Sequence, residues 1–407
     1  MPTPKLRFKE FNGDWTNKKI GDIAAKVGSG STPRGGAEAY TDTGIIFIRS
    51  QNVNNDRLLL DDTVYIPEST HLKMSGSKVV ANDILLNITG ASIGRSCVVP
   101  SDFTEANVNQ HVCIIRTPND DPVFVQSFLS SENGQNSIQS KQAGGGREGL
   151  NFQAIRSIDF HFPPSKQEQT KIASFLSAVD EKINQLTQKQ ELLSQYKQGM
   201  MQKLFSQQLR FKADDGSEFG EWEEKALKTI ARIYDGTHQT PNYVEDGVPF
   251  YSVEHVTANN FSKTKFIAED VFLDELKRVQ LEKNDILLTR IGDIGTSKLI
   301  DWDVRASFYV SLALIKVDKN HNSSFVNQYI KSIFFQKELH ERTIHVAFPK
   351  KINLGEIGLC LIRLPCLAEQ TKIANFLSAI DQKIEVVAQQ IEQAKTWKKG
   401  LLQQMFV

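Results

Sequence analysis

EQTKIASFLSAVDEKI (168–183) and EQTKIANFLSAIDQKI (369–384) are two copies of nearly one sequence, placed 201 residues apart in a chain of 407 residues. At this offset, residues 164–205 and 365–406 share 20 identities in 42 positions. A match of this length predicts a duplicated structural element rather than two unrelated surface helices.

Each copy has the apolar spacing of a long helix that pairs with another helix. Apolar residues follow alternating steps of four and three over 172–204, and the second copy repeats the pattern over 373–405. Sustained spacing of this kind is typical of a coiled-coil seam. Ser165 and Glu168 are predicted to form a capping box at the first start, whereas the second start, with Cys366 at the cap, is less well specified. About 40 helical residues would span about 60 Å.

The segments between the helices are duplicated too, although more faintly. The recurring motifs are LRFK (6–9 and 209–212), the turns GSGSTP (28–33) and GTHQTP (236–241), and NDILL (82–86 and 284–288). Alternating Val, Ile and Phe residues between Gly-rich turns predict strands, and 123–131 and 325–335 resemble short amphipathic helices. Each segment is therefore predicted to be a mixed, β-rich α+β domain of about 150 residues.

The order of the repeats predicts the topology. LRFK follows the first helix at 209 but has no helix before it at the N-terminus, and its missing predecessor is the helix that ends at Val407. Joined end to end, the chain would be a closed cycle of domain, helix, domain and helix. This cycle predicts antiparallel helices, a pseudo-twofold axis, and N- and C-termini that lie close together.

The composition is that of a soluble globular protein, with 40% hydrophobic and 24% charged residues. No apolar run of about 18 residues could span a bilayer, and the N-terminal MPTPKLRFKE lacks the apolar core of a signal peptide. We therefore expect a cytoplasmic protein without a membrane partner. Because 48 Lys and Arg balance 48 Asp and Glu, nucleic acid would have to be bound by local basic patches or with the help of other subunits.

Two diverged domains that alternate with two near-identical helices, together with EQxKIAxFLSAxDxKI and NDILL, resemble the specificity subunit of type I restriction-modification systems. The resemblance covers essentially the whole chain. It implies that 1–163 and 209–364 are target recognition domains, each reading one half of a bipartite double-stranded DNA site. It also implies that 164–208 and 365–407 are spacer helices, which set the distance between the half-sites and dock two modification (methyltransferase) subunits.

The family's restriction (motor-nuclease) subunits would join this core, and the complex would direct adenine-N6 methylation and restriction. Because the two domains differ in sequence, the resemblance implies two unlike half-sites and hence an asymmetric DNA site.

The chain itself carries no recognisable catalytic motif. It has no GxxxxGK[ST] phosphate loop and no Asn-Pro-Pro-aromatic or Asp-Pro-Pro-aromatic tetrapeptide, which an adenine methyltransferase would be expected to carry. The spacing of its His and Cys residues selects neither a triad nor a metal site. We therefore expect a non-catalytic subunit without a cofactor. Two alternatives stay open: a coiled-coil scaffold that organises an assembly without reading DNA, and an enzyme whose active site has no familiar motif.

Candidate DNA contacts lie at polar loop tips, where a β scaffold commonly presents recognition residues. Phosphates are bound by Lys, Arg or backbone N–H groups, and base edges by Arg, Lys, Asn, Gln or Ser/Thr. The candidates in the first domain are Ser31, Thr32, Arg34, Lys141, Arg147 and Asn151. The candidates in the second domain are Thr237, His238, Gln239, Thr240, Arg342, His345, Lys350 and Lys351. Each of these loops could equally be an ordinary solvated connection.

Candidate contacts with the modification subunits lie at matched positions of the two helices. They are Lys171, Lys182 and Gly199 in the first helix and Lys372, Lys383 and Gly400 in the second. Glycine inside a helix costs about 1 kcal/mol relative to alanine. The matched glycines therefore predict a close backbone approach, either between the two helices or to a partner, with fraying near the helix end as the alternative.

Overall fold

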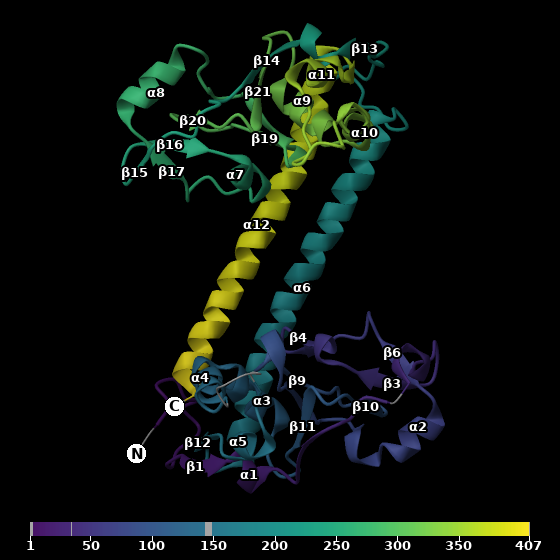
Figure 1. Ribbon diagram of the computed structural model, residues 1–407, viewed down its shortest axis with the longest axis vertical. Coiled ribbons are helices and arrows are strands. Elements are labelled where there is room, and N and C mark those ends of the chain that lie inside the picture. Colours follow the sequence, from purple (N-terminus) through teal and green to yellow (C-terminus); the bar gives the residue numbers. More distant parts are fainter. Residues whose placement is uncertain (1–2, 34, 143–148, 407) are drawn as a thin grey trace. The chain divides into compact units, whose positions relative to one another are not determined.

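The computed structural model describes residues 3–33, 35–142 and 149–406. Contacts divide the chain into unit 1, Met1–Thr187 with Gln389–Val407, and unit 2, Gln188–Ala388. Each unit thus contains part of both long helices, α6 (Lys166–Phe205) and α12 (Leu367–Met405), which are teal and yellow in Figure 1. Because the first part of α6 shares a unit with the last part of α12, the helices pair antiparallel, as predicted.

Unit 1 is built on two four-stranded sheets. Their strand orders are β2-β11-β8-β9 and β6-β3-β10-β7, while β1 pairs with β12 and β4 with β5. The strands are β1 (Thr16–Lys19), β2 (Lys26–Ser29), β3 (Ile45–Ile48), β4 (Val53–Asn54), β5 (Arg57–Leu58), β6 (Val64–Ile66), β7 (Lys78–Val79), β8 (Ile84–Asn87), β9 (Ser96–Val98), β10 (Ala106–Val108), β11 (Val112–Arg116) and β12 (Asp159–Phe162). The short helices are α1 (Ile20–Ile23), α2 (Glu68–Lys73), α3 (Pro122–Ser130), α4 (Glu132–Ser140) and α5 (Phe152–Arg156).

Unit 2 repeats this plan, with strand orders β14-β21-β18-β19 and β15-β17-β16-β20 and a β13–β22 pair. The strands are β13 (Glu223–Ala226), β14 (Ala231–Asp235), β15 (Tyr243–Val244), β16 (Val248–Tyr251), β17 (Lys265–Ile267), β18 (Ile286–Ile291), β19 (Asp293–Leu299), β20 (Ser307–Phe308), β21 (Leu312–Val317) and β22 (Leu361–Leu364). The short helices are α7 (Val253–Thr257), α8 (Glu269–Leu276), α9 (Ser323–Ile330), α10 (Ile333–Arg342) and α11 (Leu354–Leu359). The predicted pair of mixed α+β domains is therefore confirmed.

The NDILL motif becomes a strand that is buried on both faces. In β8, Ile84 and Leu86 pack into the core that contains α3 and the long helices, whereas Leu85 packs into a second core on the opposite face. In β18, Leu288 and Leu287 are divided between two cores in the same way. Successive side chains of a strand point to opposite faces, so burial of both faces explains a continuous apolar run where half-burial would give alternation.

Most apolar residues of the predicted seams are buried, and Ile183, Leu193, Met200, Ile384 and Ala394 are half-buried. In α6 the buried seam residues are Ile172, Leu176, Val179, Leu186 and Leu204. In α12 they are Ile373, Leu377, Ile380, Val387, Ile391, Leu401 and Met405. The polar contacts between the helices recur with the two helices exchanged: Asp180 pairs with Lys398 at 2.7 Å in unit 1, and Asp381 pairs with Lys197 at 2.7 Å in unit 2. The repeat in sequence is thus also a repeat in contacts.

The start of α6 is fixed by a buried carboxylate. Ser165 Oγ accepts a hydrogen bond from Glu168 N at 3.2 Å, so the serine half of the predicted capping box forms. The glutamate half was predicted wrongly, because the Glu168 side chain is fully buried and accepts instead from Arg7 at 2.7 and 2.8 Å and from Trp15 Nε1 at 3.2 Å. A charge-assisted, bidentate arginine contact outcompetes the local cap.

The start of α12 is held in the same way. Glu369 is fully buried and accepts from Arg210 Nε at 3.1 Å, from Arg210 Nη2 at 2.7 Å and from Trp222 Nε1 at 3.2 Å. The duplicated LRFK motif and the tryptophan that follows it therefore have one structural role, which is to fasten each domain to the first turn of the helix that leaves it.

The two chain ends meet inside unit 1. Leu6 N donates to the carbonyl of Gln404 at 3.0 Å, and Phe406 packs against Phe124 and Phe128, with ring centroids 5.2 and 6.1 Å away. The prediction that the terminal segments lie close together is confirmed. In unit 2 the same bond forms within the continuous chain, from the amide of residue 209 to the carbonyl of residue 203 at 3.1 Å.

Candidate nucleic-acid interface

Two segments that the sequence predicts to contact DNA converge on one edge of unit 2. The turn after β14 lies beside the segment before β21, since Thr237 pairs with Tyr309 and Val310 N donates to the carbonyl of Thr237 at 2.9 Å. The same segment contacts the end of β18, where Arg290 N donates to the carbonyl of Ser311 at 2.9 Å.

The basic loop after α10 joins the other side of β18. Gly292 N donates to the carbonyl of Lys350 at 2.8 Å, and Ile291 pairs with Lys351. Four backbone segments therefore lie side by side in the order turn, β21 entry, β18 exit and basic loop. The sequence predicted the first and the last of these segments separately, and the sheet brings them together.

Unit 1 has the same arrangement. Gly30 N donates to the carbonyl of Asn109 at 3.2 Å, and Ile88 N donates to the carbonyl of His111 at 3.0 Å. Leu150 N then donates to the carbonyl of Ile88 at 2.9 Å. The turn, the strand entry, the strand exit and the loop follow one another as in unit 2, so each unit presents an equivalent edge.

A glycine allows each turn to lie close to its neighbour. A Cβ on Gly30 would lie 1.6 Å from the carbonyl oxygen of Val108, and a Cβ on Gly236 would lie 2.1 Å from that of Phe308. No side chain fits at such distances, which explains why both turns carry glycine just before their polar tip.

The side chains at the edge of unit 1 form a hydrogen-bonded row. Ser31 and Thr32 are exposed, and the Thr32 hydroxyl bonds to the side-chain oxygen of Gln110. Gln110 contacts His111 at 3.2 Å, and His111 contacts Thr89 at 2.7 Å. Gln110 and His111 were not predicted from sequence, although the polar stretch Asn109–His111 before the apolar strand was a signal for them.

The edge of unit 2 carries different side chains. His238, Gln239 and Thr240 are exposed, and the Thr240 hydroxyl lies 3.3 Å from that of Tyr309. Tyr309 was not predicted from sequence because it lies between two strands of an otherwise apolar segment.

An acidic residue positions a histidine and an arginine at this edge. Asp235 contacts His238 Nε2 at 2.6 Å and Arg278 at 2.7 Å. Burial acts to raise the pKa of Asp235, but the hydrogen bond with His238 and the charge of Arg278 outweigh it, and the pKa lies below its usual value. The carboxylate is therefore ionised and holds the His238 ring and the Arg278 guanidinium at the turn.

The basic loop of unit 2 has an apolar tip. His345, Lys350 and Lys351 are exposed, and Val346 and Phe348 are fully exposed. Lysines next to an exposed aromatic ring combine a phosphate-binding charge with a surface on which a base can stack. This composition is better suited to nucleic acid than to a small polar ligand.

Arg342 lies away from this tip and has acidic partners of its own. Its guanidinium contacts Glu338 at 3.1 Å and Glu356 at 3.6 Å. The hydrogen bond with Glu338 raises the pKa of Arg342. Of the predicted cations of this loop, Arg342 is thus already paired within the chain.

The remaining candidates of unit 1 have less direct positions. Asn151 caps α5, because its side-chain oxygen accepts from Ala154 N at 2.8 Å. Lys141 is half-buried at the end of α4. Arg34 and Arg147 lie outside the described residues.

The first matched lysines of the long helices form ion pairs inside their own units. Lys171 lies 3.6 Å from Glu10, and Lys372 lies 2.6 Å from Asp214. Both contacts fasten the segment around an LRFK motif to the helix, so this pair has a role within the chain.

The other matched positions of the helices face outward. Lys182 and Lys383 are exposed and make no ion pair with any residue in the described ranges. A Cβ on Gly199 or Gly400 would meet no atom within 4 Å. The predicted close approach between the two helices is therefore wrong at both glycines, and an approach by a partner stays a prediction.

Replacing Gly199 and Gly400 with alanine is expected to stabilise the chain by about 0.5–1 kcal/mol per site, because alanine costs less backbone entropy in a helix and the added methyl is accommodated. Chemical denaturation of the double variant measures this gain. A loss of stability would show that the glycines pack within the chain. If a modification subunit contacts the two glycines, the double variant should bind that subunit more weakly although the variant itself is more stable.

The described residues form neither a metal cluster nor a membrane-spanning helix. No group of three or more His, Cys, Asp or Glu side chains there could hold a metal ion. None of the described helices combines the length and apolar character that a membrane span requires.

Comparisons with known proteins agree with the resemblance seen in the sequence. The family model for the type I restriction modification DNA specificity domain matches residues 12–194 and 220–396. The MjaVIII specificity subunit of a type I restriction enzyme from Methanocaldococcus jannaschii is 25% identical, over 97% of this chain and 94% of the relative. The putative MjaX specificity subunit from the same organism is 24% identical, over 98% of this chain and 94% of the relative.

Solved structures share the fold. The S subunit of a type I restriction-modification system from M. genitalium has a TM-score of 0.65 at 18% identity, covering 100% of this chain and 99% of that one. A chain from a study of the complex assembly of a type I R-M system has a TM-score of 0.56 at 14% identity, covering 95% of this chain and 96% of that one. Since the family model covers most of the chain in two copies, this chain belongs to the family of type I restriction-modification DNA specificity domains.

Proposed function

We propose that the chain is the DNA-reading subunit of a type I restriction-modification complex. Specificity subunits are the non-catalytic components of these systems. The recognition domains, 1–163 and 209–364, each read one half of a bipartite, asymmetric site in double-stranded DNA. The helices within 164–208 and 365–407 set the spacing and dock two modification subunits, which restriction subunits join. The complex acts in the cytoplasm and directs adenine-N6 methylation and restriction.

The observation that supports this proposal is the duplicated edge with unlike side chains. Both units bring a turn and a loop together through the same backbone hydrogen bonds. Unit 1 presents Thr32 and Gln110 there, whereas unit 2 presents His238, Tyr309 and Lys350. Because hydrogen-bonding side chains of different type select different bases, one scaffold with two sets of tips favours two different half-sites.

Methylome sequencing of a methylation-free host that expresses this chain with its modification subunit tests the proposal. The expected result is one bipartite motif, with N6-methyladenine on opposite strands of two unlike halves. Exchange of residues 1–163 for another recognition domain should then change one half only. A stable complex that yields no motif would contradict the proposal and favour a scaffold without DNA reading.

The proposed contacts can be tested within the same complex. Lys350→Ala and Lys351→Ala should weaken DNA binding about equally for all sequences and reduce the slope of log K against log salt by about 1 each. Lys319→Ala, an exposed lysine of unit 2, is the matched control. An unchanged slope would remove the basic loop from the interface.

A further inference from the structure

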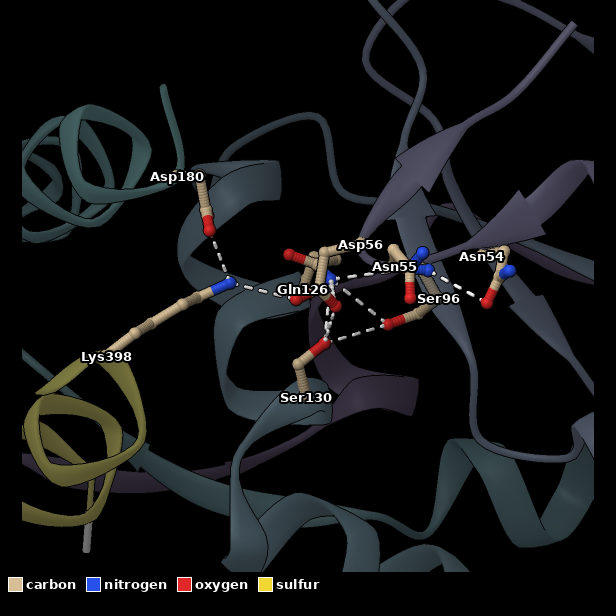
Figure 2. Close-up of polar contacts among 8 residues, drawn as sticks. All are labelled: Asn54, Asn55, Asp56, Ser96, Gln126, Ser130, Asp180 and Lys398. Carbon is tan, nitrogen blue, oxygen red and sulfur yellow. Dashed lines mark hydrogen bonds and ion pairs between the residues drawn. The ribbon is translucent and has the colours of Figure 1, made fainter. Parts of the chain in front are cut away.

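A loop of unit 1 is anchored to the long helices by one carboxylate. Asp56 lies in the turn between β4 and β5, with a left-handed φ of 59°. Figure 2 shows its carboxylate between α3 and α12: Lys398 contacts it at 2.9 Å, Ser130 Oγ donates at 2.6 Å and Gln126 Nε2 donates at 3.0 Å. Lys398 also contacts Asp180 of α6 at 2.7 Å. The site therefore binds a carboxylate with donors from two elements.

Unit 2 has equivalents of the side chains that surround Asp56, and these are called the frame of the site. The equivalent pairs, each 201 positions apart, are Ser96 and Ser297, Gln126 and Asn327, Ser130 and Lys331, Asp180 and Asp381, and Lys398 and Lys197. Contacts within the frame persist, since Lys197 lies 2.7 Å from Asp381 and Ser297 Oγ donates to Asn327 at 2.9 Å.

Two differences invert the charge of the site in unit 2. Among the described residues, Asp381 is the carboxylate that contacts Lys197, with no second one in the role that Asp56 has for Lys398, and Lys331 stands where unit 1 has Ser130. The site of unit 1 thus holds one cation and two anions, whereas that of unit 2 holds two cations and one anion. The missing charge is negative.

A cavity of about 780 Å³ lies beside Lys331 in unit 2. Its lining includes Asn259 and Gln328, the lysines Lys298 and Lys331, and the carboxylates Asp301, Asp381 and Glu385. Gln328 is only 3% exposed. Its Nε2 donates to Asp381 at 2.7 Å, but its Oε1 has no hydrogen-bond partner among the described residues. A ligand that satisfies this cavity would bring both a negative charge and an N–H donor.

The charged groups that face Lys331 agree with this requirement. Lys331 is exposed as a whole residue, but desolvation of its ammonium group among these side chains lowers its pKa to about 8, the charges of Lys197 and Lys298 add to the shift, and Asp381 opposes it only in part. A second carboxylate would relieve the repulsion between the lysines.

We propose that this cleft of unit 2 binds an acidic residue on a turn of a partner protein, in the way that unit 1 binds its own Asp56. The carboxylate would pair with Lys331 and Lys197, and a backbone N–H of the same turn would donate to Gln328 Oε1. A polypeptide turn supplies both groups, which a free carboxylate ion does not. The identity of the partner rests on the proposed function, under which it is a modification subunit.

The first test measures the affinity of the full chain for its modification subunit by titration calorimetry. Lys331→Ser installs the residue that unit 1 uses at this position, so the fold is expected to persist. The affinity should fall about tenfold, near the low end for a close charge pair at an interface, because Lys331 is exposed in the chain alone, whereas Lys319→Ser should leave it unchanged. An affinity equal to that of the unchanged chain overturns the proposal.

The second test fills the cleft from within. Asn259 has a left-handed φ of 47°, similar to that of Asp56, and Asn259→Asp supplies a carboxylate on the cavity wall. The substitution should raise the melting temperature of unit 2 by about 2–4 °C, and the gain should disappear when Lys331 is also replaced. It should also weaken binding of the modification subunit, because the new carboxylate occupies the cleft. Sodium acetate could instead stabilise the chain only while Lys331 is present, with the variants binding the modification subunit normally. That result would assign the site to small carboxylates and overturn the proposal of a protein partner.

These readouts are independent of DNA reading. If the unchanged complex methylates no motif, the proposed function fails, yet the calorimetric comparison still decides between an occupied and an empty cleft. If a motif is methylated and Lys331→Ser binds its subunit normally, only the cleft proposal fails.

Discussion

Replacing Glu168 with alanine is expected to lower the free energy of opening of unit 1 by about 3 kcal/mol, the usual cost of removing one member of a buried ion pair. Glu168 is fully buried, and the Arg7 side chain that it binds is only 14% exposed. Without the carboxylate, the guanidinium would lose its counter-ion and the indole N–H of Trp15 would lose its acceptor. Both groups would pay the cost of desolvation without a partner.

Hydrogen exchange with mass spectrometry assigns the loss to a unit, because peptides of β1 and α3 report on unit 1 and peptides of β13 and α9 report on unit 2. Glu181→Ala, an exposed change on the same helix, should have little effect, and Glu369→Ala should open unit 2 instead. Equal loosening of both units by Glu168→Ala would contradict a local role for the carboxylate.

Replacing Lys398 with methionine is expected to lower the free energy of unfolding by about 2 kcal/mol at pH 7. This loss is smaller than the usual cost of breaking a buried ion pair, because the acidic partners of Lys398 are partly exposed. The Lys398 side chain is only 15% exposed, and its ammonium group contacts both Asp56 and Asp180. Burial acts to raise the pKa of Asp56, but Lys398 and the hydrogen bonds from Ser130 and Gln126 outweigh it and keep the pKa below its usual value. Methionine would leave two neighbouring carboxylates without their shared cation.

The pH dependence of this loss follows from the Asp56 carboxylate, whose pKa folding lowers, whereas burial raises the pKa of Asp180, the other partner of Lys398. A carboxylate whose pKa is lowered by folding contributes stability above its unfolded pKa, and the contribution is lost as the pH falls through the folded value. The difference between the chain and the Lys398→Met variant should therefore shrink below about pH 4. Denaturation at pH 7 and at low pH measures it. Lys197→Met is the matched control in unit 2 and should cost less, because Lys331 remains near Asp381. A constant difference across the pH range would exclude the ion pairs as its cause.

The long helices were predictable because their information is local. A seam that repeats every three to four residues needs only a partner of the same period, and the duplication supplied that partner. The buried seam and the antiparallel pairing follow directly from the two copies. The same local reading failed at Glu168, where a capping box suggested a short-range bond. Its true partner is Arg7, 161 positions earlier, and no local pattern carries that information.

The candidate interface was predicted as fragments. Thr237 and Lys350 stood out because polar residues cluster at loop tips, but their convergence depends on the order of β14, β21 and β18 in the sheet. Gln110 and Tyr309 were missed because they lie between strands rather than in an obvious loop. Arg342 was predicted as a contact from its charge alone, and sequence spacing did not reveal that Glu356 would lie beside it.

The division of the chain into units has a consequence for its synthesis. Unit 2 is the single stretch Gln188–Ala388, whereas unit 1 also requires Gln389–Val407, including Leu402, Met405 and Phe406 in its core. Because domains fold in the order in which the ribosome supplies them, unit 1, most of which is made before unit 2, must wait for residues that are made after unit 2. A nascent chain stalled before Lys398 would hold every residue of unit 2 and an unfinished unit 1, with its apolar surface open to chaperones.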